Sequence, residues 1–354
     1  MATIDPGDLR RLLAGIYEAK GTPGAVAATV AGLQVEANLA GHDSHGAILT
    51  TDYVARIDQG HIAPDAPIEV VAESPVTAVI DGHWGFGFAV TTRATELLIE
   101  KAGRDGLAAI TIRRQSHVGR LGAYTSRVAA RGMIGLMTAD SGAGPKAAAP
   151  FGGRERRLGT NPLSIALPAE SSIVCLDMAT TTVAAGKLNL AIHRGEPIPD
   201  GWIVDREGRP TRRAEDYYEG GALLPLGGDQ GHKGYGLSFV VEALSGLLTG
   251  LGFGLDPSGR HNDGCFLAAF DVARFRPLAQ FKRDMEDFIR FLKATEPAAG
   301  FKEVLYPGEV EARARRERER SGIEVDDASW QRITDIARSL GVTVPVPRAP
   351  PGDR

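Results

Sequence analysis

Strand-like and helix-like segments alternate through the middle of this 354-residue chain. Short β-branched runs typical of strands lie at residues 68–71, 76–80, 107–112, 134–138, 163–167, 173–176 and 266–270. Runs with helical spacing of apolar side chains lie between them, at residues 89–102, 123–131, 179–191 and 233–248. Alternation of this kind is typical of layered folds in which helices cover a sheet. We therefore expect an α/β fold.

Both ends of the chain have helical patterns instead. A first helix is expected to follow the capping pair Asp5 and Pro6, with further helices at residues 22–41 and 48–58. Beyond residue 276 the helical runs lie at residues 288–292, 311–320 and 330–340. The alternating charges of residues 311–320 indicate a solvated helix.

These patterns divide the chain into four parts. They are a helical N-terminal segment at residues 1–75, an α/β domain at 76–275, a helical C-terminal segment at 276–343 and a flexible tail at 344–354. Within the α/β domain, residues 194–231 are rich in glycine, proline and charge and are predicted to form a long loop. Loops of that length inside a compact domain are usually functional or disordered.

Glycine is unusually frequent in the α/β part of the chain. The chain has 44 glycines, and 30 of them lie between Gly82 and Gly259, whereas an ordinary protein has roughly 7% glycine. No Gly-X-Y period is present, and 43% apolar residues with a net charge of −4 exclude collagen and low-complexity disorder. We expect the glycines to let the backbone approach a ligand closely.

Charge and hydropathy exclude several classes of function. The 40 basic and 44 acidic residues leave no broad basic surface for nucleic acid. No apolar run near the N-terminus is long enough for a signal or membrane segment, so a cytoplasmic protein without a membrane partner is expected. Cys175 and Cys265 fit neither a disulfide framework nor a zinc spacing and are predicted to be buried core thiols.

The common nucleotide-binding fingerprints are missing. Residues 85–90 begin a G-x-G pattern but lack its final glycine and the acidic partner for a ribose, and no Walker A segment is present. A bound nucleotide would therefore use neither a Rossmann fold nor a P-loop.

The most distinctive polar cluster is Asp43-Ser44-His45-Gly46, at a break between helices. A histidine in such a break can transfer protons near neutral pH. The cluster could equally be a helix cap with a satisfied loop histidine. His42 and His45 could share a metal, but no further ligand follows at a recognisable spacing.

Other polar segments adjoin predicted strands or helix starts. His117 and Arg120 follow a strand, where Arg120 could bind a carboxylate or simply be a surface arginine. Residues 159–162 and 177–180 could bind a ligand or serve only as turns and caps. His232-Lys233 opens a helix whose N-terminus could hold an anion, or is a plain loop-to-helix entry.

Taken together, these segments resemble the type II malate/L-lactate dehydrogenase family, oxidoreductases that do not use a Rossmann fold. The likeness spans about residues 9–341 in family order and is carried by Gly41-His42-Asp43-Ser44-His45-Gly46, Ser116-His117-x-Gly119, Phe151-Gly152-Gly153, Leu158-Gly159-Thr160-Asn161-Pro162, Leu176-Asp177-Met178-Ala179-Thr180, Pro225-Leu226-Gly227, His232-Lys233-Gly234-Tyr235 and Leu305-Tyr306-Pro307-Gly308-Glu309. Residues 38–40 and 59–61 look most like the hydroxycarboxylate dehydrogenase B branch, whose members reduce 2-oxo acids.

The resemblance implies NAD or NADP bound in a family-specific, non-Rossmann sheet domain, with the helical N- and C-terminal segments packed together as a second unit. It also implies a homodimer. The catalytic residues it implies are His45, His117 and Ser44, with His45 ranked first as the proton donor and no metal required. The cofactor contacts it implies are His45, Gly119, Arg120, Leu121, Ser141, Cys175, Leu176, Asp177, Met178, Ala179, His232, Lys233, Gly308 and Glu309.

One departure from the family bears on the substrate. Many relatives have an arginine four residues after the first histidine, where this chain has Leu49. An apolar residue cannot bind a second carboxylate, which favours a 2-oxo acid with an apolar or aromatic side chain, such as phenylpyruvate. Arg120 and Thr160 would then contact the substrate. His45 as an imidazolium would protonate the developing alkoxide while the cofactor delivers hydride.

Several alternatives stay open at this stage. The substrate could be a cyclic imine carboxylate, or malate or lactate themselves. A metal-dependent hydrolase built on His42, His45 and His61 belongs to a different class, and a third possibility is a ligand-binding relative without turnover. The sequence does not choose between NAD and NADP, because the ribose-binding acid of Rossmann enzymes has no readable counterpart here.

Overall fold

The computed structural model describes residues 1–141, 146–253, 260 and 262–348. A seven-stranded mixed sheet crosses its middle, in the order β2-β3-β4-β11-β5-β6-β7. Its strands are β2 (Glu69–Glu73), β3 (Thr77–Gly85), β4 (Leu107–Gln115), β5 (Met133–Ser141), β6 (Leu163–Pro168), β7 (Ile173–Met178) and β11 (Asp263–Asp271). The pair β3–β4 is parallel and the other neighbours are antiparallel. The α/β prediction is confirmed.

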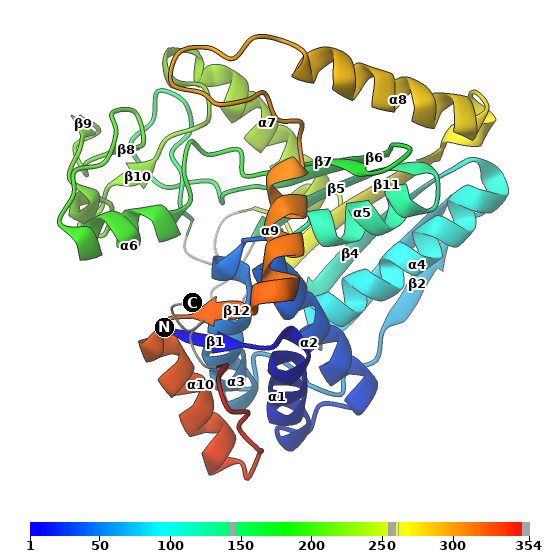
Figure 1. Cartoon of the computed structure of the whole chain (residues 1–354). Coiled ribbons are helices and arrows are strands. Elements are labelled where there is room, and N and C mark those ends of the chain that lie inside the picture. The colour runs from blue at the N-terminus through cyan, green and yellow to red at the C-terminus, as the bar shows by residue number, and fades with distance from the viewer. Residues whose placement is uncertain (142–145, 254–259, 261, 349–354) are drawn as a thin grey trace, which may run out of the picture.

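Helices cover both faces of this sheet (Figure 1). Helix α4 (Gly87–Asp105) connects the parallel strands β3 and β4, and α5 (Gly122–Ala130) packs on β5 and β6. On β5, Gly135 faces Val128 of α5, whereas Thr138 contacts Ser245 of the π-helical turn Ala243–Leu247 that continues α7 (His232–Glu242). Side chains alternate along a strand, so α5 and this turn lie on opposite faces.

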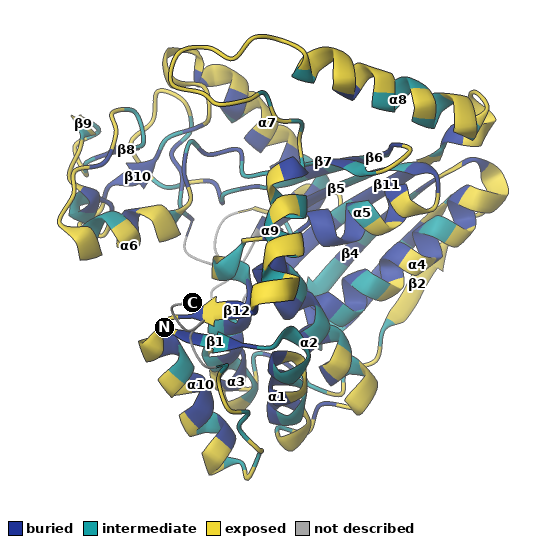
Figure 2. Ribbon diagram, in the orientation of Figure 1, coloured by how far each residue is buried: buried dark blue, intermediate teal, exposed yellow. Residues whose placement is uncertain are grey.

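The two ends of the chain meet beside the sheet. Strand β1 (Ala2–Ile4) pairs antiparallel with β12 (Ile323–Val325), and α10 (Asp327–Ser339) packs against α1 (Pro6–Ala19) and α3 (Thr50–Asp58). Helix α2 (Gly24–Leu39) packs against α4 and against α9 (Glu309–Ser321). One continuous apolar core joins these helices to the sheet, as in the edge-to-face contact of Tyr17 and Phe86. Figure 2 shows this core as the buried centre, with α8 (Leu278–Lys293) largely exposed at the periphery.

Two expectations about the elements are wrong, and one pairing of strands was not expected. The helix expected at residues 179–191 is α6 (Ala185–Arg194), because Thr180 is held by hydrogen bonds to the Thr160 and Asn161 carbonyls. The loop expected at residues 194–231 contains a small sheet with its own apolar cluster, formed by β8 (Ile203–Val204), β9 (Pro210–Thr211) and β10 (Ala222–Leu223). The pairing of β1 with β12 was not anticipated, because three residues are too few to show a period.

Two glycines near the polar segments allow close packing of the protein on itself. Gly119 has φ +72°, and a Cβ there would lie 2.4 Å from the Phe88 ring. A Cβ at Gly87 would lie 2.1 Å from the carbonyl oxygen of Ser116. These contacts, rather than room for a ligand, account for glycine at both positions. No helix among the described residues is both long and apolar enough to cross a membrane.

Candidate active site

Two histidines from distant parts of the chain lie against each other. His45 ends the short 3₁₀ helix Asp43–His45, and His117 follows β4. Their rings stack with centroids 5.7 Å apart and an interplanar angle of 25°. The structure thus brings together two of the three residues for which catalytic roles are expected from the sequence.

The turn that carries His45 is held by its neighbours. Asn38 donates from Nδ2 to Asp43 (2.7 Å) and accepts the Ala47 N–H (2.9 Å). Arg318 of α9 pairs with both oxygens of Asp43, at 2.6 and 2.9 Å. Asp43 is therefore an anchor for the turn rather than a helix cap. Ser44 Oγ lies 3.0 Å from His45 Nδ1.

His117 is fixed by a tyrosine and by a close backbone contact. The hydroxyl of Tyr53 in α3 lies 2.6 Å from His117 Nδ1. Burial raises the pKa of Tyr53 well above its usual value, so the phenol keeps its proton and can donate it to Nδ1. Gly87 packs on the Ser116 and His117 carbonyls and donates its N–H to Ser116 Oγ at 3.1 Å.

His45 is a neutral imidazole in the free protein at pH 7. The pKa of His45 is lowered to about 4, chiefly by burial and also by the nearby charges of His42 and Arg120, while Asp263 acts in the opposite direction. The imidazolium form of His45 that was expected from the sequence is therefore not the form in the free protein. A neutral ring can accept a proton and can donate one only after taking it up.

The histidine pair separates two cavities. One, of about 220 Å³, is lined by both histidines together with Val118, Gly119, Leu121, Ala139, Asp140, Ala147, Gly159, Thr160, Asn161, Pro162 and Asp263. The other, of about 210 Å³, is lined by both histidines together with Ser44, Leu49, Asp52, Tyr53 and Arg56. A group bound in either cavity would lie against the same pair of imidazoles.

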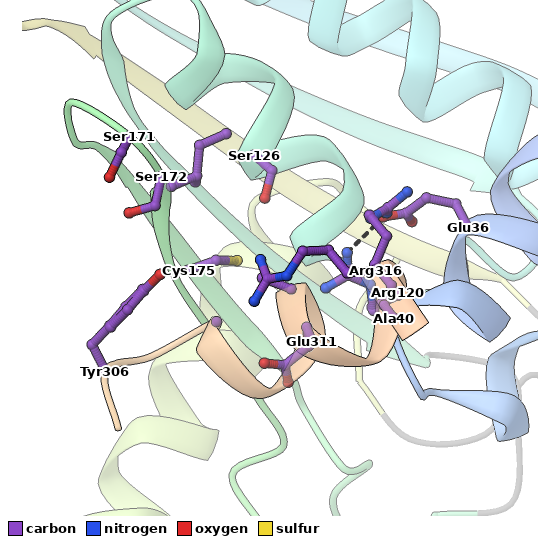
Figure 3. A pocket seen from close by; sticks show the side chains of 14 residues that line it. Glu36, Ala40, Arg120, Ser126, Ser171, Ser172, Cys175, Tyr306, Glu311 and Arg316 are labelled. Atoms are coloured by element: carbon purple, nitrogen blue, oxygen red, sulfur yellow. Dashed lines mark hydrogen bonds and ion pairs between the residues drawn. The ribbon is translucent and has the colours of Figure 1, made fainter. Parts of the chain in front are cut away.

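A third and larger cavity, of about 720 Å³, contains several of the predicted cofactor contacts. Arg120, Cys175 and Gly308 line it, and Figure 3 shows Arg120 beside Glu36 and Arg316. The Arg120 guanidinium donates to Glu36 at 2.8 Å and lies 3.6 Å from Asp177. Arg120 therefore lies with the cofactor candidates and not in the two cavities at the histidines. Arg120 lines this large cavity, whereas its chain neighbours Gly119 and Leu121 line the 220 Å³ cavity.

The remaining predicted cofactor contacts are spread over a wider area. Leu176, Asp177 and Met178 belong to β7, which Ala179 follows, and Asp177 accepts the Gly122 N–H at 2.8 Å. Glu309 is occupied by ion pairs with Lys293 and Arg313. His232 and Lys233 lie exposed at the start of α7 and line none of the three cavities. Ser141 ends β5, and its side chain lies outside the described part of the structure.

Two sequence expectations near the site need correction. Cys265 is fully buried, but Cys175 is half-buried and lines the large cavity, so it is not a core thiol. Helix α9 is not simply solvated, because Glu311 contacts His42 (3.2 Å), Arg315 contacts Glu36 (2.6 Å) and Arg318 contacts Asp43. A charge pattern alone does not distinguish side chains in water from side chains paired with another element.

The fold brings further residues to the site that no motif in the sequence marks. Tyr53 and Arg56 lie within the helix expected at residues 48–58, and Asp263 begins β11. Arg56 donates from Nε to Asp52 at 3.0 Å, and its terminal N–H groups have no further partner among the described residues. The spacing of Leu49, Asp52 and Arg56, three and seven residues apart, would place them on one helix face and could have indicated a shared surface.

A buried charged cluster forms one wall of the 220 Å³ cavity. Lys146 Nζ lies 3.3 Å from Asp140 and 3.1 Å from Glu242, and Asn161 donates to Glu242 at 2.9 Å. Burial raises the pKa of Asp140 to about 7, and the Glu242 charge acts in the same direction. Among the described residues, no group of three or more histidine, cysteine, aspartate or glutamate side chains is arranged to hold a metal ion.

Comparison with known proteins identifies the family. The family model described as malate/L-lactate dehydrogenase matches residues 4–334. The chain belongs to the malate/L-lactate dehydrogenase family. It is 37% identical over 330 residues to malate dehydrogenase of Pyrococcus abyssi, covering 91% of this chain and 90% of the relative. It is 33% identical over 346 residues to hydroxycarboxylate dehydrogenase B of Escherichia coli, covering 96% and 94%.

The fold of this dehydrogenase agrees with a solved relative. Sulfolactate dehydrogenase from Methanocaldococcus jannaschii superimposes with a TM-score of 0.90 at 35% identity, covering 97% of this chain and 98% of that one. The protein is therefore an oxidoreductase of the hydroxyacid type. A nicotinamide cofactor and a small 2-hydroxy or 2-oxo acid substrate follow from the family.

Proposed function

We propose that this dehydrogenase reduces a 2-oxo acid with an apolar or aromatic side chain, such as phenylpyruvate, and catalyses the reverse oxidation. The observation that carries the proposal is the stacked pair of His45 and His117 between two cavities, one of which is lined by Leu49. That arrangement allows a substrate and the reactive end of a cofactor to meet at the imidazoles.

The residues present fit a dinucleotide. The 220 Å³ cavity would hold the nicotinamide, and residues 119–121 would lead to the 720 Å³ cavity, which would hold the adenosine. Two buried polar atoms have no hydrogen-bond partner within the described part of the chain, Asn161 Oδ1 at the first cavity and Arg120 Nε at the second, and they support a polar ligand here. The cofactor supplies the hydride. The chain positions the reacting groups, excludes water and moves the proton.

The proton step follows from the environment of His45. A 2-oxo acid is an anion, and an opposite charge nearby raises the pKa of an imidazole. Substrate binding would therefore let His45 take up the proton that it then gives to the alkoxide. Ser44 orients His45 through Nδ1, and Tyr53 orients His117 in the same way. With both rings oriented, His45 would donate the proton and His117 would hold the substrate oxygen.

Arg56 is our candidate for the substrate carboxylate. Its terminal N–H groups have no partner among the described residues, whereas Arg120 is engaged with Glu36 and Asp177. The apolar side chain of Leu49 would then contact the substrate tail, and Thr160 would lie on the cofactor side of the histidines. A second candidate function is malate dehydrogenase. In that case Arg56 would bind the second carboxylate of the substrate, and not the carboxylate next to the reacting carbon.

A spectrophotometric screen tests the substrate. NADH or NADPH oxidation would be followed with phenylpyruvate, pyruvate, oxaloacetate and a cyclic imine carboxylate at equal concentrations. We expect kcat/KM for phenylpyruvate to exceed that for oxaloacetate by about tenfold or more, because a carboxylate against Leu49 would be desolvated without a partner. The variant L49R should reverse the order. A higher kcat/KM for oxaloacetate in the unmodified protein would favour malate dehydrogenase as the function. A higher kcat/KM for the cyclic imine would favour a reductase of cyclic imine carboxylates.

Rival classes give different results in the same assay. Turnover that survives a chelator dismisses a metal-dependent hydrolase. Cofactor binding without turnover on any of these acids would indicate a non-catalytic relative.

We also propose a homodimer. Apolar side chains are exposed on α7 and α8, including Phe239 (60%), Phe288 (54%) and Phe291 (74%), and α8 lies at the exposed edge in Figure 2. Surface aromatic clusters of this kind mark interaction sites, and a second copy of the chain is the partner proposed. Light scattering after gel filtration should give twice the 37.5 kDa chain mass. The double variant F288S/F291S should give a monomer, and a monomeric unmodified chain would contradict the proposal.

A further inference from the structure

We propose that Arg316 binds the adenosine 2′-phosphate of NADP in the 720 Å³ cavity, so that NADP(H) is the preferred cofactor. This inference rests on the proposed function, because it assumes that a nicotinamide dinucleotide reaches from the histidine pair into this cavity. It assigns to α9 a role in ligand recognition beyond the cofactor contacts expected from the sequence.

The position of the cavity identifies which part of the cofactor it takes. Gly119 and Leu121 line the cavity beside His45 and His117, and Arg120, between them in sequence, lines the large cavity. A dinucleotide with its nicotinamide at the histidines and its middle near residues 119–121 would therefore place its far end, the adenosine ribose, in the large cavity. The 2′-phosphate is the group that distinguishes NADP from NAD at that end.

The acidic residues of the large cavity are already engaged. Glu36 accepts from Arg120 at 2.8 Å and from Arg315 at 2.6 Å, and Glu311 lies 3.2 Å from His42 Nε2. Asp177, behind Arg120, accepts the Gly122 N–H. Enzymes that select NAD commonly present a free carboxylate to the ribose hydroxyls. Both arginine contacts of Glu36 use Oε1, and its buried Oε2 has no hydrogen-bond partner among the described residues. The two guanidinium groups offset the charge of Glu36, which does not favour selection of NAD.

Arg316 is the cation that these pairs leave available. It lines the cavity, is exposed, and makes no ion pair among the described residues. Figure 3 shows Arg316 with Arg120 and Glu36 on one side of the cavity and Ser171 and Ser172 on the other, with Ser126 above. A guanidinium offers paired N–H donors that match a phosphate. The serine hydroxyls provide polar lining for the rest of the adenosine.

Binding of cofactor fragments tests the proposal without turnover. Isothermal titration would compare adenosine 2′,5′-bisphosphate, adenosine 3′,5′-bisphosphate and adenosine 5′-monophosphate. A charge-assisted contact predicts that the 2′-phosphate strengthens binding by about ten- to a hundredfold over the monophosphate. The 3′-phosphate should give much less, and added salt should reduce the advantage because the contact is partly exposed.

Two variants locate the effect. R316Q should lose most of the advantage of the 2′-phosphate, and R316K should keep part of it. The matched control R320Q removes another exposed arginine of α9 that does not line the cavity, and it should keep the full advantage. Equal affinities for the three ligands, or an equal loss in R320Q, would overturn the assignment.

Failure of this inference differs from failure of the proposed function. If only the 2′-phosphate site is wrong, the protein still turns over 2-oxo acids with NADH, and the fragments bind alike. If the proposed function is wrong, neither reduced cofactor supports turnover, whatever the fragments show.

Discussion

The hydroxyl of Tyr53 gives the sharpest test of the proposed site. It lies 2.6 Å from His117 Nδ1, and the tyrosine is 2% exposed. The variant Y53F removes one oxygen and keeps the ring, which packs edge-to-face on Phe86 and Phe88 at 6.3 and 5.8 Å. The fold should therefore persist while His117 loses the group that orients it.

The size of the effect follows from that contact. A hydrogen bond whose loss leaves a buried partner unsatisfied costs about 1–3 kcal/mol. If the contact is needed in the transition state, kcat should fall roughly 5- to 150-fold, with little change in KM. The free energy of unfolding should fall by about 1 kcal/mol.

The matched control is Y17F. Tyr17 is also buried, its hydroxyl donates to Gln34 at 2.7 Å, and its ring packs edge-to-face on Phe86 at 5.4 Å, but it lines neither cavity at the histidines. Urea unfolding and steady-state reduction of phenylpyruvate would be measured for both variants. Y17F should lose similar stability and keep kcat within about twofold. If Y53F keeps full kcat, or Y17F loses as much, Tyr53 does not orient a catalytic histidine.

Three further predictions concern other parts of the site. H45Q should lower turnover by about a hundredfold or more with an unchanged far-UV spectrum, as expected for loss of acid–base catalysis; near-normal turnover would exclude His45 as the proton donor. Because the pKa of His45 is lowered to about 4, kcat/KM for oxidation of the 2-hydroxy acid, which needs the neutral imidazole, should stay level from about pH 5 to 8 and fall only in more acidic buffer. Burial raises the pKa of Asp140 from 3.8 to about 7, so the folded protein holds a proton that the unfolded chain releases, and stability should decline as pH rises from about 4 to 7; urea unfolding of D140N should show a smaller decline, and an equal one would refute this.

The sheet and most helices could be predicted from the sequence, because their apolar periods are long enough to identify. Residues 107–112 and 134–138 lie inside β4 and β5, and residues 89–102 lie inside α4. The motif residues His45 and His117 could be singled out, but their stacking could not, since it depends on how the 3₁₀ turn Asp43–His45 and the end of β4 meet. Arg56 and Tyr53 lie on α3 among ordinary helix residues, and only the fold shows which of them face the histidines.

The charged helix α9 shows most clearly why pattern alone is insufficient. Its alternating charges predict a helix exposed to solvent. In the structure, however, Arg318 holds the turn of His45 through Asp43, Arg315 pairs with Glu36, and Arg316 lines the large cavity. These contacts join the C-terminal segment to the N-terminal helices and, through Glu36, to Arg120 in the segment between β4 and α5. Ion pairs across elements cost desolvation and depend on both partners being in place. The three cavities are therefore properties of the whole chain, and residues 76–275 alone would lack His45, Arg316 and the contacts that position them.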